Sequence, residues 1–252
     1  MSPVLDDSGL LALLDEVASA VGAALASLED WGLADTVPGQ HHCDLVADAA
    51  ALDVLRRAGV GVLSEESGLH RPTEQIVVVV DPVDGSTNAA HGVPWFATAL
   101  CAVDERGPRV ALVHNHATGD RFDAIRGEGA RRNGAVLKPS GEERLSHALV
   151  GLNGLPPQPF GAGQYRMLGA MAPDLCAVAS GVLDGFVDCT VGTVGPWDYM
   201  GSLLVCREAG AIVEDAYGRD LVVLNHAARR VPVAAGTPAL QRALMRARDW
   251  PR

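Results

Sequence analysis

The segment that most constrains the fold is the apolar run at 76–80, which is followed by Asp81-Pro82-Val83-Asp84-Gly85-Ser86-Thr87-Asn88. An isoleucine and four valines in a row predict a strand that is buried on both faces. Pro82 favours a type I turn, which would bring the Cα atoms of Asp81 and Asp84 within about 7 Å of each other. The segment therefore predicts either two carboxylates that converge on a cation beside free backbone N–H groups, or an ordinary turn that caps a strand.

The composition narrows the classes of function. At 252 residues and 48% hydrophobic content, the chain can form one large α/β domain or two lobes that share a core. A formal net charge of −11 argues against a nucleic-acid surface, which would need clustered Lys and Arg. Because bound cations invert the charge that a phosphate meets, a metal site would reconcile this acidity with an anionic substrate.

The sequence also bears on the cellular compartment. Its five cysteines form no C-x-x-C pair and are odd in number, which favours a reducing compartment. Residues 1–30 show no basic leader before their apolar stretch, and no uninterrupted apolar run approaches the roughly 20 residues of a membrane span. We expect a cytoplasmic protein with neither a membrane nor a nucleic acid as partner.

Helical and strand patterns alternate along the chain. Helices are predicted from about 10 to about 31, from 45 or 48 to 58, and at 171–182 and 199–209, with a last helix N-capped by Thr237. Strands are predicted at 60–64, 76–80, 95–103, 110–113, 121–125, 186–191, 211–214, 221–224 and 231–235, with a hairpin over 127–134. Loops are predicted at 33–43 and 67–75. The Pro- and Gly-rich interval 138–166 divides the single domain 1–252 into lobes of about 1–140 and 141–252.

Four carboxylates follow or precede predicted elements: Glu65, Asp81, Asp84 and Asp198. If the strands at 60–64 and 76–80 pair in parallel, their acidic ends share the sheet edge at which α/β proteins bind ligands. Two Mg²⁺ ions about 3.5–4 Å apart can clamp a phosphoryl group when several carboxylates hold them. Taken singly, Asp198 is more typical of a helix N-cap and Glu65 of a solvated loop. Only the set indicates a metal site.

Three ordered signatures carry a resemblance to a known family: Ser64-Glu65-Glu66-Ser67-Gly68, the motif 81–88, and Trp197-Asp198. The chain resembles the inositol monophosphatase family over about residues 45–215. The resemblance implies an α/β protein with a layered α-β-α-β-α fold. It also implies a phosphomonoesterase that uses two or three Mg²⁺ ions, is inhibited by lithium and forms a homodimer.

The resemblance also implies roles for single residues. The metal ligands would be Glu65, Asp81, Asp84, Asp198 and the carbonyl of Val83. Catalysis would use Glu65 and Ser86, which replaces the usual threonine and would help deprotonate the attacking water, with Asp48 as its acidic partner. The threonine usual upstream of that acid is missing from Asp44-Leu-Val-Ala-Asp48. The substrate would contact Glu65, Val83, Asp84, Gly85, Ser86, Thr87, Gly169, Ala170 and Asp198.

The implied reaction is direct hydrolysis of a small phosphate monoester by an activated water, without a covalent enzyme intermediate. Inositol 1-phosphate is the default substrate, although inositol enzymes carry an acidic residue where this chain has Val191. Histidinol phosphate, fructose bisphosphate, adenosine bisphosphate and NADP are the alternatives. A protein-binding role, as in some bacterial relatives that act in transcription, is disfavoured by the intact carboxylate set.

Two further residues lie on one face of a predicted strand, His114 and His116. A metal site is one interpretation of such a pair. A partly exposed strand face is favoured, because the sequence shows no third ligand nearby.

Overall fold

The structure is a computed structural model and describes residues 5–34 and 36–248. Asp35, in the predicted loop 33–43, and the ends of the predicted domain 1–252 lie outside the described residues.

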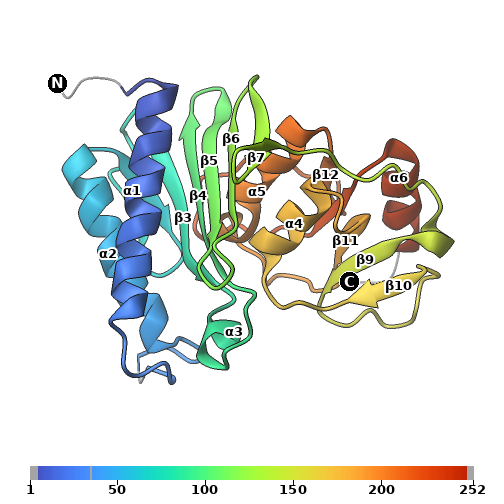
Figure 1. Ribbon diagram of the computed structural model, residues 1–252, viewed down its shortest axis with the longest axis horizontal. Coiled ribbons are helices and arrows are strands. Elements are labelled where there is room, and N and C mark those ends of the chain that lie inside the picture. The colour runs from blue at the N-terminus through green and yellow to red at the C-terminus, as the bar shows by residue number, and fades with distance from the viewer. Residues whose placement is uncertain (1–4, 35, 249–252) are drawn as a thin grey trace.

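Helices and sheets alternate in five layers, α-β-α-β-α, as expected (Figure 1). Two helices cover the outer face of the first sheet, two lie between the sheets, and one covers the second sheet. In this order they are α1 (Asp7–Ala26), α2 (His42–Ala58), α4 (Met171–Ala179), α5 (Pro196–Ala209) and α6 (Pro238–Ala247). The short helices are α3 (Ser86–Ala90) and η1 (Leu145–His147). The α/β class and its layering are confirmed.

The first sheet has eight strands in the order β2-β1-β3-β4-β5-β6-β7-β8. β1 and β3 pair in parallel, with Ser64 of β1 beside Val80 of β3, so the acidic ends of the two strands share one edge. The bounds are β1 (Gly61–Ser64), β2 (Gly68–His70), β3 (Val77–Asp84), β4 (Ala97–Asp104), β5 (Gly107–Asn115), β6 (Arg121–Ile125), β7 (Gly129–Arg132) and β8 (Ala135–Val136).

The second sheet has five strands in the order β10-β9-β11-β13-β12. They are β9 (Leu149–Asn153), β10 (Gln164–Arg166), β11 (Gly185–Asp188), β12 (Ile212–Asp215) and β13 (Pro232–Ala235).

The interval 138–166, predicted as the boundary between two lobes, contains β9 and β10. Gly151 does not weaken β9, because a Cβ there would lie 2.9 Å from the Leu183 side chain, so the glycine allows close packing. The expected strand 221–224 is a loop, in which the Tyr199 hydroxyl donates to the Leu221 carbonyl at 2.8 Å.

Several element ends also differ from the predictions, for local reasons. α2 begins at His42 because the Asp44 carboxylate accepts the His41 N–H at 2.8 Å and caps the helix. α4 ends at Ala179 because the chain turns through Gly181, whose φ is 72°. β3 does not end in a turn at Asp81 but continues to Asp84, with a shift of register against β4 between these two residues.

α1 is long and apolar enough, by length and composition alone, to cross a membrane, with a mean hydropathy of 1.6. This average is reached although Asp15 and Glu16 interrupt the apolar run, so it does not contradict the prediction made from uninterrupted runs. In the structure its buried residues belong to the core cluster under the first sheet, and they include Leu10, Leu14, Val17 and Val21. α1 is therefore a covering helix of the core.

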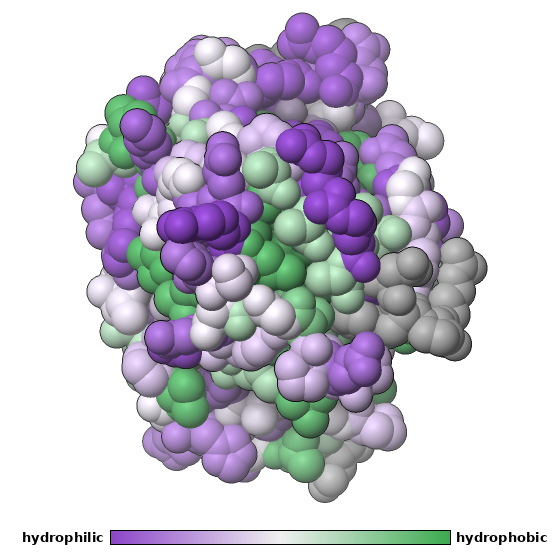
Figure 2. All heavy atoms as spheres, turned by 90° about the vertical axis from the view of Figure 1, so that its right-hand side faces the viewer, coloured by the Kyte–Doolittle hydropathy of each residue, from purple (hydrophilic) through white to green (hydrophobic). Residues whose placement is uncertain are grey.

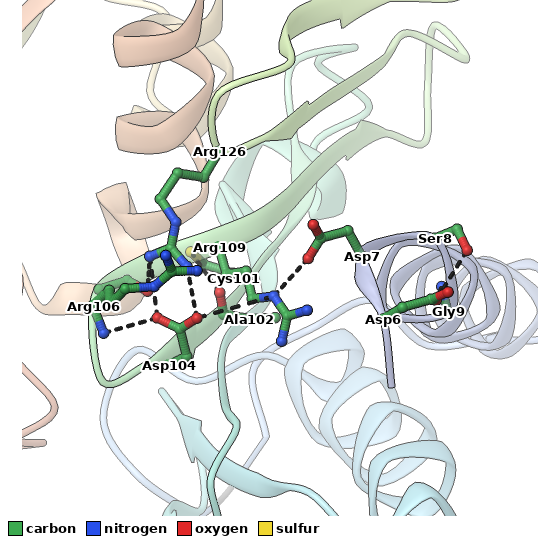
Figure 3. A network of polar contacts seen from close by, with 11 residues as sticks. Asp6, Asp7, Ser8, Gly9, Cys101, Ala102, Asp104, Arg106, Arg109 and Arg126 are labelled. Atoms are coloured by element: carbon green, nitrogen blue, oxygen red, sulfur yellow. Dashed lines mark hydrogen bonds and ion pairs between the residues drawn. The ribbon is translucent and has the colours of Figure 1, made fainter. Parts of the chain in front are cut away.

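A network of charged side chains fixes the N-terminal end of α1 against the hairpin of β4 and β5 (Figure 3). The Arg109 guanidinium donates to Asp7 at 2.5 Å and lies 4.0 Å from Asp104, which also accepts from Arg126 at 2.6 Å. Because these groups are partly exposed, the network contributes more to orientation than to stability.

The other end of the molecule is the outer surface of the second sheet and α6, and it is mostly hydrophilic around a small hydrophobic area (Figure 2). α6 begins as predicted, because the Thr237 hydroxyl accepts the Leu240 N–H at 3.2 Å. Its Leu240 and Leu244 are fully buried. α6 thus covers β11 and β13 on the outer side of the second sheet.

α5 lies close against the first sheet at Gly201. A Cβ there would lie 3.1 Å from the Leu100 carbonyl oxygen and 3.3 Å from the Leu100 nitrogen, both in the middle of β4. β4 lies inside the sheet and cannot move easily. The absence of a side chain at Gly201 therefore sets the spacing between α5 and the sheet.

We therefore predict that Gly201→Ala lowers the free energy of unfolding. Alanine in a helix normally stabilises by about 1 kcal/mol over glycine, but overpacking a core costs about 1–3 kcal/mol and should prevail here. Urea unfolding measures the change, with exposed Ala49→Gly in α2 as the control for propensity alone. A more stable Gly201→Ala variant would show that the helix can move away from the sheet.

Candidate active site

Four carboxylates predicted as metal ligands reach one place from three elements. Glu65 follows β1, and its N–H donates to the Val80 carbonyl at 3.1 Å, so it lies next to Asp81 on β3. Asp198 stands in the first turn of α5, where its carboxylate accepts the Gly195 N–H at 2.5 Å. Oxygen atoms of these three carboxylates all lie within 4.8 Å of one another.

Asp84 joins this cluster from the far side of the bulge in β3. Its carboxylate accepts the N–H of Ala172 at 2.5 Å, at the start of α4. This bond ties the first sheet to the layer of helices between the sheets. Asp84 therefore has a fixed orientation within the cluster.

Burial and mutual repulsion make the cluster electrostatically unfavourable without a cation. Burial raises the pKa of Glu65 to about 8, and neighbouring carboxylates add to this rise. Burial raises the pKa of Asp84 to about 7, against the opposing effect of the Ala172 and Met171 N–H groups. The pKa values of Asp81 and Asp198 lie well above the usual range, first through burial and then through the other carboxylates.

One observation tests whether a cation fits this site. The Asp81 Oδ1 atom is buried and has no hydrogen-bond partner among the described residues. A buried, unpaired carboxylate oxygen among three other carboxylates is the environment that a hard divalent cation such as Mg²⁺ satisfies. The donor set therefore fits the expected metal.

These carboxylates line a cavity of about 490 Å³. Most of the predicted site residues line it, namely Glu65, Asp81, Val83, Asp84, Gly85, Ser86 and Asp198. Thr87, Gly169, Ala170 and Asp48 are not among the lining residues.

The backbone between β3 and α3 can take its shape only with glycine at position 85. Gly85 has a φ of 88°, and a Cβ there would lie 2.9 Å from the Ala170 Cβ and 3.0 Å from the Trp95 carbonyl. A Cβ at Gly169 would lie 3.1 Å from the Asn88 side chain, which donates to the Leu168 carbonyl at 2.8 Å. The structure thus places residues 169–170 beside the 85–88 loop.

The predicted pairing of Asp48 with Ser86 differs from the geometry. Asp48 instead accepts a hydrogen bond from the Ser64 hydroxyl. Asp44, one helical turn earlier, lies against Ser86, whose hydroxyl opposes the rise that burial gives to the Asp44 pKa. The early start of α2 explains the difference, because it places Asp44 inside the helix and nearer to the site.

Two cavity residues that were not predicted from the sequence, His226 and Arg229, come from the loop after β12. The His226 Nε2 atom lies 2.9 Å from the Glu65 carbonyl oxygen. Its ring packs on Trp197 at 4.7 Å between centroids, and the Arg229 guanidinium lies over the same indole ring at 5.2 Å. No local sequence pattern identifies these two residues, because they follow the segment 221–224, which was predicted to be a strand.

Comparison with known proteins places this fold and site in a class. Residues 40–249 match the model of the inositol monophosphatase family. A fructose-1,6-bisphosphatase of Pyrococcus furiosus is 33% identical over 194 residues, covering 76% of this chain and 76% of that protein. An inositol-1-monophosphatase of Mesorhizobium japonicum is 31% identical over 271 aligned positions, covering 95% of this chain and 96% of that protein.

A solved structure gives the same result for the fold. A hypothetical protein of Pyrococcus horikoshii, described as similar to inositol-1 monophosphatase, superimposes with a TM-score of 0.81 at 25% identity. The match covers 94% of this chain and 96% of that one. The chain belongs to the inositol monophosphatase family, and it is accordingly a phosphoric monoester hydrolase of a magnesium-dependent class.

The raised pKa values predict how pH and Mg²⁺ act together on stability. Glu65 and Asp84 bind protons more tightly in the metal-free folded protein than at their ordinary values of 4.5 and 3.8. The stability gained from these protons is complete below the ordinary values and is lost as pH rises through about 7 and 8. Because Mg²⁺ competes with those protons, the rise in unfolding temperature that it causes should be larger at about pH 8 than at about pH 5.

Thermal unfolding with Mg²⁺ or with a chelator, over this pH range, measures the effect. The control is Asp120→Asn, which removes a surface carboxylate that is paired with Arg132. This variant should leave the Mg²⁺-dependent rise in unfolding temperature unchanged. An equal Mg²⁺ increment at both ends of the range would contradict the prediction.

Proposed function

We propose that the protein is a Mg²⁺-dependent phosphatase of a small phosphorylated alcohol, with inositol 1-phosphate as its substrate. The observation that carries this proposal is the convergence of Glu65, Asp81, Asp84 and Asp198 on one cavity beside the start of α3. Four carboxylates placed this closely, two of them buried and two partly buried, destabilise a fold unless they bind a cation, so their presence favours a catalytic metal site over a purely structural role.

The four carboxylates and the Val83 carbonyl would hold the two or three ions. When bound, Mg²⁺ lowers the pKa of a coordinated water and neutralises charge on the phosphate. We propose that Ser86 orients this water, with Glu65 beside it, and that Asp44 rather than Asp48 takes its proton through the Ser86 hydroxyl. Asp48 would act only through Ser64, at the end of β1.

The remaining predicted contacts concern the substrate. The N–H groups of Gly85, Ser86 and Thr87, at the start of α3, would donate to the phosphate. Gly169 and Ala170, which lie against the 85–88 loop, would contact the alcohol part. The carboxylates Glu65, Asp84 and Asp198 would meet the phosphate through the metal.

The names of the relatives support two substrates. The Mesorhizobium relative is an inositol-1-monophosphatase, and the Pyrococcus furiosus relative is a fructose-1,6-bisphosphatase. Inositol 1-phosphate remains the proposed substrate, although Val191 is a half-exposed valine where inositol enzymes have an acid. Histidinol phosphate, fructose bisphosphate, adenosine bisphosphate and NADP are the alternatives, and a regulatory, protein-binding role is the alternative from another class.

We also propose that the protein is a cytoplasmic homodimer that lithium inhibits, with no membrane or nucleic-acid partner. Residues of about 1–140 would form the metal-binding lobe, and those of about 141–252 the lobe that contributes Asp198. The five cysteines are free, and four of them are buried, which supports a reducing compartment.

A phosphate-release panel tests the proposed activity. Inositol 1-phosphate, histidinol phosphate, fructose 1,6-bisphosphate and NADP are assayed with and without Mg²⁺. We expect Mg²⁺-dependent turnover that is highest with inositol 1-phosphate and that is abolished in Asp81→Asn, because this change removes a buried ligand oxygen. Absence of turnover with every substrate would count against a phosphatase, whereas another preferred substrate would correct only the substrate.

The two acids of α2 provide a matched pair of variants. Asp44→Asn should lower kcat by roughly a factor of 100 or more, because an amide cannot accept the proton of the water. Asp48→Asn should leave kcat nearly unchanged, because its amide oxygen still accepts from Ser64. Steady-state kinetics at saturating Mg²⁺ show which of the two acids contributes more to kcat. A larger loss of kcat in Asp48→Asn than in Asp44→Asn would restore Asp48 as the partner of Ser86.

A further inference from the structure

The metal-binding stretch of β3 contains a bulge whose shape needs support. Asp81 pairs with Ala99 and Asp84 pairs with Ala97, so Pro82 and Val83 together face the single residue Thr98 of β4. Proline has no N–H to give to the sheet, and such a bulge leaves the ladder locally disrupted. The spacing between the two aspartates therefore depends on whatever holds residues 82 and 83 in place.

Thr98 supplies a contact at this point. Its hydroxyl donates to the Pro82 carbonyl at 2.8 Å, and the residue is completely buried. The carbonyl belongs to the residue directly between Asp81 and Val83. The hydrogen bond thus fixes the orientation of the Pro82–Val83 peptide plane. The directions in which Asp81 and Val83 point depend on that orientation.

His116 completes the arrangement from the end of β5. Its Nε2 atom lies 2.7 Å from the Thr98 hydroxyl. The single hydroxyl proton goes to the Pro82 carbonyl, which can only accept, so Nε2 must carry a proton and donate to the hydroxyl oxygen. Burial, followed by the nearby His114, lowers the pKa of His116 to about 4, which keeps this ring neutral at physiological pH.

The imidazole of His116 is itself held on several sides. It stacks on His114 at 4.8 Å between centroids and faces Phe96 at 6.4 Å. In α1, a Cβ at Gly22 would lie 3.2 Å from its Nδ1 atom, so the glycine makes room for the ring. The two histidines are not a metal site, because no third ligand joins them among the described residues and their rings stack.

We propose that Thr98 and His116 are positioning residues, which hold the Pro82–Val83 bulge so that Asp81, Val83 and Asp84 face the same cations. The inference rests on the proposed function and adds to it a contact chain from α1, through β5 and β4, to the metal loop. Neither side chain lines the cavity, so both act only through the backbone of β3.

Thr98→Val tests the proposal, because valine keeps the shape and removes the hydroxyl. It leaves the Pro82 carbonyl and the His116 Nε2–H without their partner in buried surroundings. We expect the Mg²⁺ concentration for half-maximal activity to rise about tenfold, and the midpoint of Mg²⁺-dependent thermal stabilisation to rise equally, with kcat at saturating Mg²⁺ little changed. Thr98→Ser keeps the hydroxyl and should restore both midpoints. His116→Phe keeps the stacking and should give a smaller shift in the same direction.

Thr237→Val is the matched control. The Thr237 hydroxyl also donates to a backbone carbonyl, that of Glu142 at 2.9 Å, but beside the second sheet. This variant should lose stability without any change in the Mg²⁺ midpoints. If Thr98→Val loses only stability in the same way, or if Thr98→Ser is as impaired as Thr98→Val, the positioning role is wrong. If the wild type neither binds Mg²⁺ nor releases phosphate, the proposed function fails and this inference fails with it.

Discussion

Repulsion among four closely placed carboxylates, two of them buried and two partly buried, is the constraint on which the rest of the structure depends. Glu65 and Asp81 stand side by side because β1 and β3 are parallel, Asp84 follows a bulge, and Asp198 arrives on α5. Each group keeps its place through a backbone hydrogen bond or the strand that carries it. The fold thus assembles, at a sheet edge, a charge density that only a bound cation makes favourable.

The helices between the sheets connect this edge to the second half of the molecule. α4 donates the Ala172 N–H to Asp84, and α5 presents Asp198 in its first turn. α5 can do so because Gly201 lets it lie close to β4. The positive end of the α5 dipole also favours an anionic side chain at this position, which offsets part of the repulsion.

The parts of this arrangement that the sequence predicted share a property. The valine run, the acids that follow it and the Trp-Asp pair are local signals, and the parallel pairing of β1 with β3 brings the acids of the two strands together. The identity of the acid that lies against Ser86 depended instead on where α2 begins. The capping hydrogen bond between His41 and Asp44 sets that position. β9 was hidden among prolines and glycines because its identity comes from packing, and His226 and Arg229 reach the cavity only through the tertiary fold.

The bond between Asp84 and Ala172 joins residues 88 positions apart, and the proposed ligands span an even longer stretch of chain. A cation held by Glu65 and Asp198 would therefore act as a removable cross-link that closes a long loop, in a chain whose five cysteines form no disulfide. Such a cross-link exists only in the folded state, so the ion that serves catalysis would also tie the two halves into one cooperative unit. A chelator would then have the effect on this protein that a reductant has on a disulfide-bonded one.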